Sequence, residues 1–147
     1  MAMKTKEIQE NLVKTMRHWQ GIERQSIAST GAVIGKTTSP LIHLVMEIIQ
    51  RDSQLHHHVQ QFIIDSIESA PVAITPEDMR EISAMIDAHL KLEEEMVGAV
   101  NAAIAQVRGK KMGIQEYLLN FLVEDEKKHA NLLTSLATIK SGLYKVS

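Results

Sequence analysis

The sequence predicts an all-α protein, an antiparallel four-helix bundle formed as a single domain over residues 1–147. Three observations predict this fold. Apolar residues recur at three- and four-residue spacing along four long segments, and no segment keeps the alternation of a strand. Aromatic residues make up only 3% of the chain, so the core must be mostly aliphatic, which suits helix packing better than a sheet. Proline and glycine residues separate the segments with short links.

The first two helices are expected over residues 5–34 and 40–69. Gly35 lies just beyond the first range and weakens that end. Ser39 is a favoured N-cap residue, and the proline that follows it fits the first position of the second helix. Pro71 then disfavours helix at the residue before it. The sequence therefore predicts a short connection between the first and second helices, and an end to the second helix just before Pro71.

The third and fourth helices are expected over residues 76–108 and 114–142. Thr75 precedes a proline and is followed three residues later by Asp78, which is the pattern of a capping box. Gly109 opens the basic turn between the third and fourth helices. These signals predict a defined start for the third helix and a short link after it.

The connection between the second and third helices constrains the topology. Only six residues, 70–75, form it. At about 3.3–3.6 Å per residue they cannot run the length of a helix of about thirty residues. Simple up-down-up-down connection is favoured. A long crossover would require the second helix to end early, near Ile64.

Composition excludes several classes of protein. The chain has no cysteine, which rules out disulfides, thiolate metal clusters and cysteine nucleophiles. Its formal net charge is −2, which gives little electrostatic support for nucleic-acid binding. No apolar run approaches the roughly 20 residues of a membrane span, and the start of the chain lacks the apolar core of a signal peptide. We therefore expect a cytoplasmic protein with no nucleic-acid or membrane partner.

Helical phase places polar residues on the apolar face of every helix, near its midpoint. Unpaired carboxylates are costly in a bundle core, so four such helices need a shared partner, for which a cation is well suited. Glu126 and His129 are three residues apart, which places both on one side of a helix. Oxygen ligands combined with imidazole suit iron or manganese, and zinc is an alternative. The inward polar residues are Glu23; Ser53, His56 and Gln60; Glu93; and Asp125 and His129, with Glu126 on the flank.

A weak internal repeat relates the two halves of the chain. Residues 16–34 align with residues 86–104, which pairs Trp19 with His89 and Glu23 with Glu93 at an offset of 70. The second and fourth helices align at an offset of 73. The repeat predicts two related helical hairpins in one bundle. At the second offset the matched pairs are Asp52 with Asp125, Ser53 with Glu126, and His56 with His129.

This pattern resembles the ferritin-like di-iron carboxylate family, which includes rubrerythrins and bacterioferritins. That family carries a Glu on one helix and a Glu-x-x-His on the next, repeated in a second hairpin. Glu126 and His129 form one Glu-x-x-His in this chain. At the other, Ser53 stands where the carboxylate is expected, three residues before His56, so this ligand position is degenerate. The metal ligands that the resemblance implies are Glu23, His56, Glu93, Glu126 and His129.

The resemblance also implies roles around the ligands. Asp52 and Asp125 would each accept the ring N–H of a metal-bound histidine across the bundle and so set its tautomer. Without its carboxylate at Ser53, the site could hold one ion, hold two weakly, or hold none. Asp52 turned inward, or His57, could replace the missing ligand. We expect His18, His43 and His89 to be structural, and His57 and His58 to lie at the surface.

The function that the resemblance implies is iron binding, as a di-iron or single-ion site, with oxidase or peroxidase chemistry on O₂ or peroxide. An external electron donor would be needed, because the chain has no cysteine-bound redox module, and a homodimer is expected. The alternative is a non-catalytic bundle whose metal site has decayed, with a structural, ligand-binding or interaction role. Ser53 favours that alternative. Iron storage in a cage is a third possibility and needs a higher oligomer.

Overall fold

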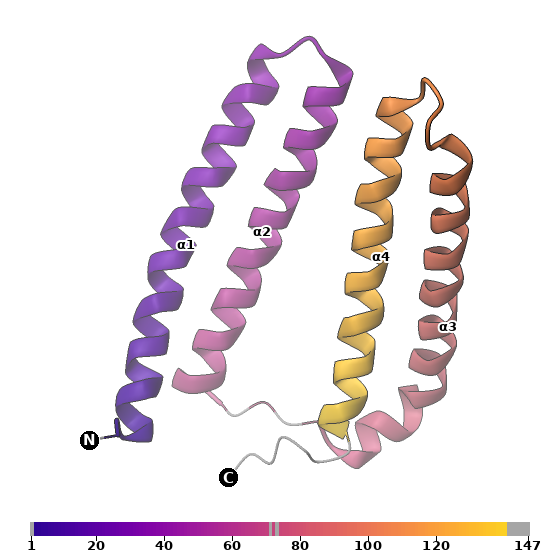
Figure 1. Cartoon of the computed structure of the whole chain (residues 1–147). Coiled ribbons are helices and arrows are strands. Elements are labelled where there is room, and N and C mark those ends of the chain that lie inside the picture. The colour runs from indigo at the N-terminus through magenta and orange to yellow at the C-terminus, as the bar shows by residue number, and fades with distance from the viewer. Residues whose placement is uncertain (1, 71, 73, 141–147) are drawn as a thin grey trace. The chain divides into compact units, whose positions relative to one another are not determined.

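Four α-helices make up the computed structural model, which describes residues 2–70, 72 and 74–140 (Figure 1). Within those ranges there is no strand. The all-helical prediction and the number of helices are confirmed. The predicted last two residues of the fourth helix, 141 and 142, lie outside the described residues. The helices are α1 (Thr5–Lys36), α2 (Pro40–Glu68), α3 (Pro76–Val107) and α4 (Gly113–Lys140).

The predicted caps form at the starts of α2 and α3. Ser39 Oγ accepts a hydrogen bond of 3.4 Å from the backbone N–H of Ile42. At α3, Thr75 Oγ1 accepts from the N–H of Asp78 at 3.1 Å, and the Asp78 carboxylate accepts from the N–H of Thr75 at 3.0 Å. The hydrogen bonds to Thr75 lower the pKa of Asp78. These bonds satisfy N–H groups that have no partner within the helix.

The prediction that the first helix stops at residue 34 is wrong by two residues, because α1 continues through Gly35 to Lys36. A glycine inside a helix costs only about 1 kcal/mol relative to alanine, so it does not by itself end one. The cap N–H of Thr37 bonds to the carbonyl of Val33 at 2.9 Å. At the end of α3, in contrast, Gly109 takes a positive φ of 74°, a conformation that glycine adopts without strain.

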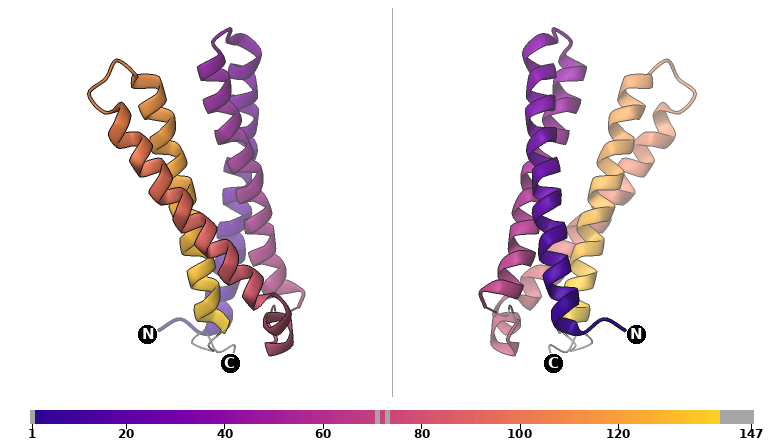
Figure 2. Two further views of the ribbon diagram at one scale, coloured as in Figure 1. Left: turned by 90° about the vertical axis from the view of Figure 1, so that its right-hand side faces the viewer. Right: turned by 90° about the vertical axis from the view of Figure 1, so that its left-hand side faces the viewer.

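The helices pack in two pairs. The chain divides into two compact units, residues 1–72 and 73–147, and α1 contacts α2 while α3 contacts α4. Figure 2 shows the helices of each pair side by side along most of their length. We call α1 with α2 the first helix pair and α3 with α4 the second helix pair. The expectation of a single domain over residues 1–147 stays a prediction.

Each pair has a small aliphatic core. In the first pair it contains Val13, Met16 and Ile64, with Ile63 and Ile67 packed against them. In the second pair the corresponding cluster joins both helices and is similar in size. It contains Val100, Ile104 and Val123, with Val97 and Leu119 packed against it. These clusters position α1 against α2 and α3 against α4, and so fix the distances between polar residues within a pair.

Much of each predicted inward face is nevertheless exposed. Trp19 is 48% exposed, and other large apolar side chains of all four helices are similarly accessible. The reason is geometric, because contact between two helices covers a strip of each surface, whereas the apolar face of a bundle helix is at least about 100° wide. The other exposed residues from the predicted inward faces are Leu12, Val33, Ile42, Ile49, Ile82, Met96, Leu122 and Leu132.

Two surface properties bear on the predicted partners. None of the described helices is long and apolar enough to cross a membrane.

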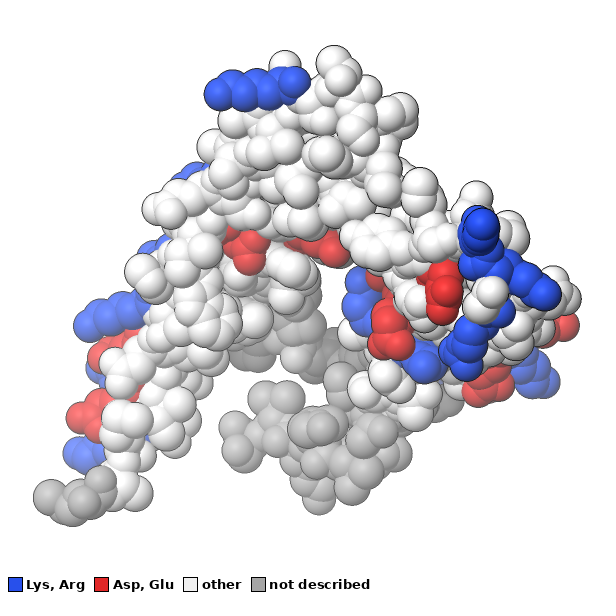
Figure 3. Space-filling view, turned by 45° about the horizontal axis from the view of Figure 1, so that its top comes forward, with Lys and Arg blue, Asp and Glu red and all other residues white. Residues whose placement is uncertain are grey.

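Arg108, Lys110 and Lys111 are exposed at the turn between α3 and α4, and Figure 3 shows basic side chains gathered at that end of the pair. They lie at a helix end, as the sequence predicts.

Candidate metal centre

The second helix pair brings three of the predicted ligands together. Glu93 on α3 faces Glu126 and His129 on α4, and one donor atom from each lies within 4.8 Å of the other two. Donor atoms that bind one ion at about 2.1 Å lie no more than about 4.2 Å apart. Small side-chain rotations would therefore be enough for the three residues to bind one cation.

Glu93 is the most buried member of this set, with only 7% of the residue exposed. Its Oε1 lies 2.9 Å from His89 Nε2 and 3.4 Å from His129 Nδ1. Its other carboxylate oxygen, Oε2, is buried and has no hydrogen-bond partner. Leaving a buried carboxylate oxygen without a partner is costly, so Oε2 favours a cation beside it or a proton carried by a neighbouring carboxyl group.

The electrostatics of the two carboxyl groups link Glu93 to Glu126. A hydrogen bond with Glu126 is the main cause that lowers the pKa of Glu93, and the two neighbouring histidines lower it further. The same hydrogen bond, with burial and the charge of Glu93, raises the pKa of Glu126. Without a cation, a proton on Glu126 can thus be shared with Glu93. A carboxyl pair of this kind can exchange its shared proton for a metal ion.

The carboxylates of Glu126 and Asp125 lie near the two ring nitrogens of His129. His129 Nδ1 lies 3.7 Å from Glu126 Oε2, and its other ring nitrogen lies 3.6 Å from Asp125 Oδ2. Both distances exceed those of a hydrogen bond, so the contacts are electrostatic. Asp125 also forms an ion pair of 2.8 Å with Lys128. The predicted hydrogen bond from a histidine ring to Asp125 is not formed within this pair, and the version across the bundle stays a prediction.

The first helix pair brings together the matching glutamate and histidine. His56 Nδ1 lies 3.4 Å from Glu23 Oε1, the same distance that separates His129 Nδ1 from Glu93 Oε1. The His56 side chain is 59% exposed, whereas that of Glu23 is mostly buried. Ser53 is buried, and its hydroxyl forms a hydrogen bond of 2.8 Å with that of Ser26. The internal repeat predicted from the sequence thus has a counterpart in side-chain geometry.

A glutamine completes the polar cluster of the first pair. Gln60 Nε2 donates to Glu23 Oε1 at 3.3 Å, and Gln60 is only 8% exposed. The two residues proposed to replace the missing ligand differ in their surroundings. Asp52 is half-buried on α2. His57 Nε2 lies 3.3 Å from Arg24 Nη1, so this histidine is directed toward a cation and not toward a metal site.

Sequence reasoning assigned no role to two residues that contact the glutamates, His89 and Gln60. His89 precedes Glu93 by four residues, a spacing that places two side chains together on one helix face. That spacing was visible in the sequence. The contact between Gln60 and Glu23 joins two helices, so it needed the structure.

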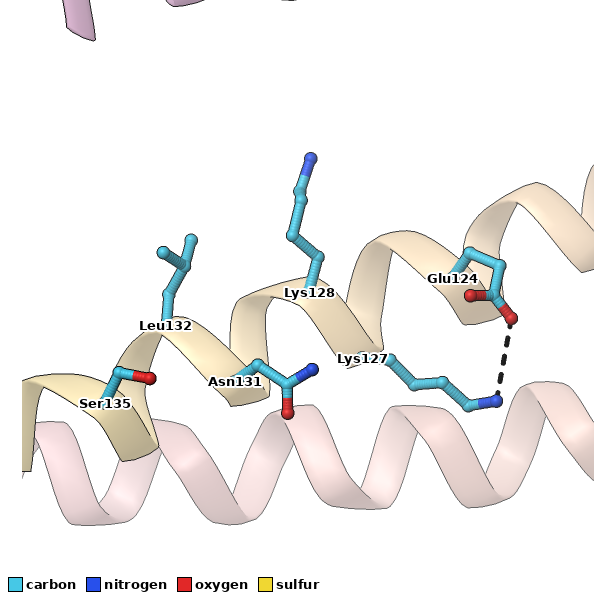
Figure 4. Close-up of a pocket in the computed structure, with 6 residues that line it drawn as sticks. All are labelled: Glu124, Lys127, Lys128, Asn131, Leu132 and Ser135. Atoms are coloured by element: carbon cyan, nitrogen blue, oxygen red, sulfur yellow. Dashed lines mark ion pairs between the residues drawn. The ribbon is translucent and has the colours of Figure 1, made fainter.

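A surface hollow of about 400 Å³ lies on α4 (Figure 4). It is lined by exposed polar and apolar side chains, including Lys127 and Glu124, which form an ion pair of 3.6 Å. None of the candidate ligands lines it. The hollow is therefore a surface feature of α4 that is separate from Glu93, Glu126 and His129.

The candidate centre thus has two parts. Glu93, Glu126 and His129 come together in the second pair, and Glu23 and His56 come together in the first. Comparison of the chain with known protein families, with curated proteins and with solved structures gives no match. The resemblance to ferritin-like proteins therefore rests on the residues described above.

Proposed function

We propose that this protein binds a transition-metal ion, iron or manganese, through Glu93, Glu126 and His129. The observation that carries the proposal is the buried Oε2 of Glu93, which has no hydrogen-bond partner and lies within a set of three suitable donors. Two carboxylates can balance the charge of a divalent cation, and imidazole with carboxylate oxygen is a donor set that suits these metals. Zinc is the competing ion for the same set.

We further propose that the two helix pairs assemble into an antiparallel, ferritin-like four-helix bundle. The support is the exposed apolar face that each pair carries, because burial of apolar surface contributes roughly 25 cal/mol per Å². The equal glutamate–histidine distances of 3.4 Å in the two pairs support two related halves. In such a bundle Glu23 and His56 would face the same core as Glu93 and His129.

The proposed chemistry is oxidase- or peroxidase-type. A bound iron or manganese would supply redox chemistry toward O₂ or peroxide. The chain's own contribution is to hold the ion and keep the carboxylates buried. Glu93 and Glu126 would balance charge, and His89 would orient Glu93 through their 2.9 Å contact. An external electron donor, a homodimeric assembly and a cytoplasmic location remain parts of this proposal.

A second candidate function is a non-catalytic bundle with a structural, ligand-binding or interaction role. Its support lies in the first pair, where Ser53 stands in place of a carboxylate and bonds to Ser26. Under this proposal the second pair would retain a carboxyl pair that shares a proton and binds no metal.

Metal analysis of protein purified without chelator separates the two candidates. We expect near-stoichiometric metal in the wild type and its loss in Glu93→Ala. Glu95→Ala is the matched control, because Glu95 lies on the same helix and is exposed. Circular dichroism should show that all three proteins keep their helical content. Metal binding by Glu93→Ala equal to that of the wild type would contradict the proposed site and leave the non-catalytic bundle.

A further inference from the structure

The two helix pairs share one glutamate–histidine arrangement and differ in what surrounds it. Glu23 with His56 and Glu93 with His129 show the same 3.4 Å separation between glutamate Oε1 and histidine Nδ1. Three of the differences at matched positions involve polar residues of the first pair. They are Ser26 against Met96, Ser53 against Glu126, and Gln60 against Leu133.

The first difference in chemistry concerns the glutamate. Glu23 Oε1 accepts a hydrogen bond from Gln60 at 3.3 Å. Gln60 is buried, so a cation that drew Glu23 away would leave the amide N–H group without this partner. An unpaired buried donor is costly. In the second pair, Leu133 occupies the matched position and offers no such bond, and Glu93 keeps one oxygen free.

The second difference concerns the position of the missing carboxylate. Ser53 is buried and its hydroxyl is bonded to that of Ser26 at 2.8 Å. Each hydroxyl therefore already has a partner inside the pair. Neither carries the negative charge that Glu126 brings to the second pair, and among the described residues the ion pair of His56 is with Glu23. One carboxylate and one imidazole make a weaker site for a divalent cation than two carboxylates and one imidazole.

We infer that the chain binds one metal ion and not two, in the second helix pair, and that hydrogen bonds from Gln60 and between Ser26 and Ser53 take the place of a second ion in the first. The inference rests on the proposed metal-binding function and assigns its stoichiometry. The first pair is then a copy of the site in which protein hydrogen bonds hold Glu23 and Ser53, with Gln60 Oε1 buried and without a hydrogen-bond partner, whereas the second pair is completed by a cation.

The test exchanges residues between matched positions in the full chain. Mn²⁺ bound per chain is measured by equilibrium dialysis for the wild type, for Glu23→Ala and for the triple variant Ser26→Met, Ser53→Glu, Gln60→Leu. We expect one ion in the wild type and one in Glu23→Ala, because the first pair holds none. The triple variant gives the first pair the residues of the second at these three positions, and we expect it to bind two.

The outcomes separate this inference from the proposed function. Two ions in the wild type, with one lost in Glu23→Ala, would overturn the single-ion inference while metal binding stands. No ion in the wild type would overturn both. A folded triple variant that still binds one ion would show that these hydrogen bonds do not close the first pair. If the triple variant does not fold, the wild-type and Glu23→Ala counts still decide the stoichiometry.

Discussion

The two helix pairs are a natural comparison within one chain. Both place a glutamate of one helix 3.4 Å from a histidine of the next, but one glutamate is bonded to an amide and the other retains a free buried oxygen. A few residues that surround each glutamate–histidine pair decide this difference. The two pairs thus share one glutamate–histidine distance while the local charge and hydrogen bonding differ.

The largest expected effect comes from making the second pair resemble the first. Glu126→Ser introduces the residue found at the matched position, Ser53. It removes one of two carboxylates, and we expect loss of Mn²⁺ binding beyond the roughly 10–100-fold that follows from losing a residue outside the ligand set. Dialysis with Mn²⁺ measures this. Glu124→Ser is the control, because Glu124 is exposed and pairs with Lys127. Equal binding by both variants would remove Glu126 from the site.

Metal removal should lower stability through the second pair. A ligand at about 100 times its Kd stabilises the folded state by about 2.7 kcal/mol when the unfolded chain does not bind it. We therefore expect added Mn²⁺ to raise the thermal midpoint of the wild type and a chelator to reverse the rise. The midpoint of Glu126→Ser should not respond. A matching rise in that variant would place the stabilising ion elsewhere.

The contact between His89 and Glu93 offers a sharper comparison with the first pair. His89→Trp introduces the residue found at the matched position, Trp19, and removes the 2.9 Å bond to Glu93 Oε1. We expect Mn²⁺ affinity to fall by about 10–100-fold, because residues that orient a ligand have effects of this size. His89→Gln should retain much of the affinity, since an amide donor can hold a glutamate, as Gln60 holds Glu23. His43→Gln is the control at an exposed position on α2.

Two outcomes would contradict a positioning role for His89. Full affinity in His89→Trp would show that Glu93 needs no such support. An equal loss in His89→Trp and His89→Gln, together with an altered absorption spectrum of bound Co²⁺, would show that His89 itself ligates the ion.

The paired carboxyl groups predict a pH dependence. The pKa of Glu126 is raised, chiefly by its hydrogen bond with Glu93, so its protonated form is favoured as pH falls. That proton competes with the cation. We expect Mn²⁺ affinity to decrease by about tenfold for each pH unit below the raised pKa, with a proton released on binding. Dialysis across a pH series measures it. An affinity that stays constant over the series would contradict the exchange of a proton for the ion.

The smallest expected effect compares the starts of α2 and α3. Thr75→Ala should cost about 1 kcal/mol of unfolding free energy in urea, since it removes a cap. Ser39→Ala should cost less, because its single bond is longer at 3.4 Å. The lowered pKa of Asp78 means that its contribution is present above its unfolded pKa and is lost as pH falls through the folded value. The cost of Thr75→Ala should therefore shrink in acid.

The sequence by itself determined the helices, their approximate ends and the candidate ligands for a cation. Caps, glycines and apolar spacing act over a few residues, so Ser39 and Thr75 begin helices as predicted. The pairing of Glu126 with His129 is also local, because residues three apart share a helix face.

Tertiary structure alone decided which polar groups meet across helices. The sequence places Ser53, Gln60 and Glu93 on inward faces, but only packing shows that Ser53 bonds to Ser26, that Gln60 bonds to Glu23, and that Glu93 keeps an unpaired oxygen. Helical phase sets the direction of a side chain to within a broad arc, whereas a hydrogen bond is decided within a few tenths of an ångström. The packing of α1 on α2 and of α3 on α4 therefore decides which of these hydrogen bonds form.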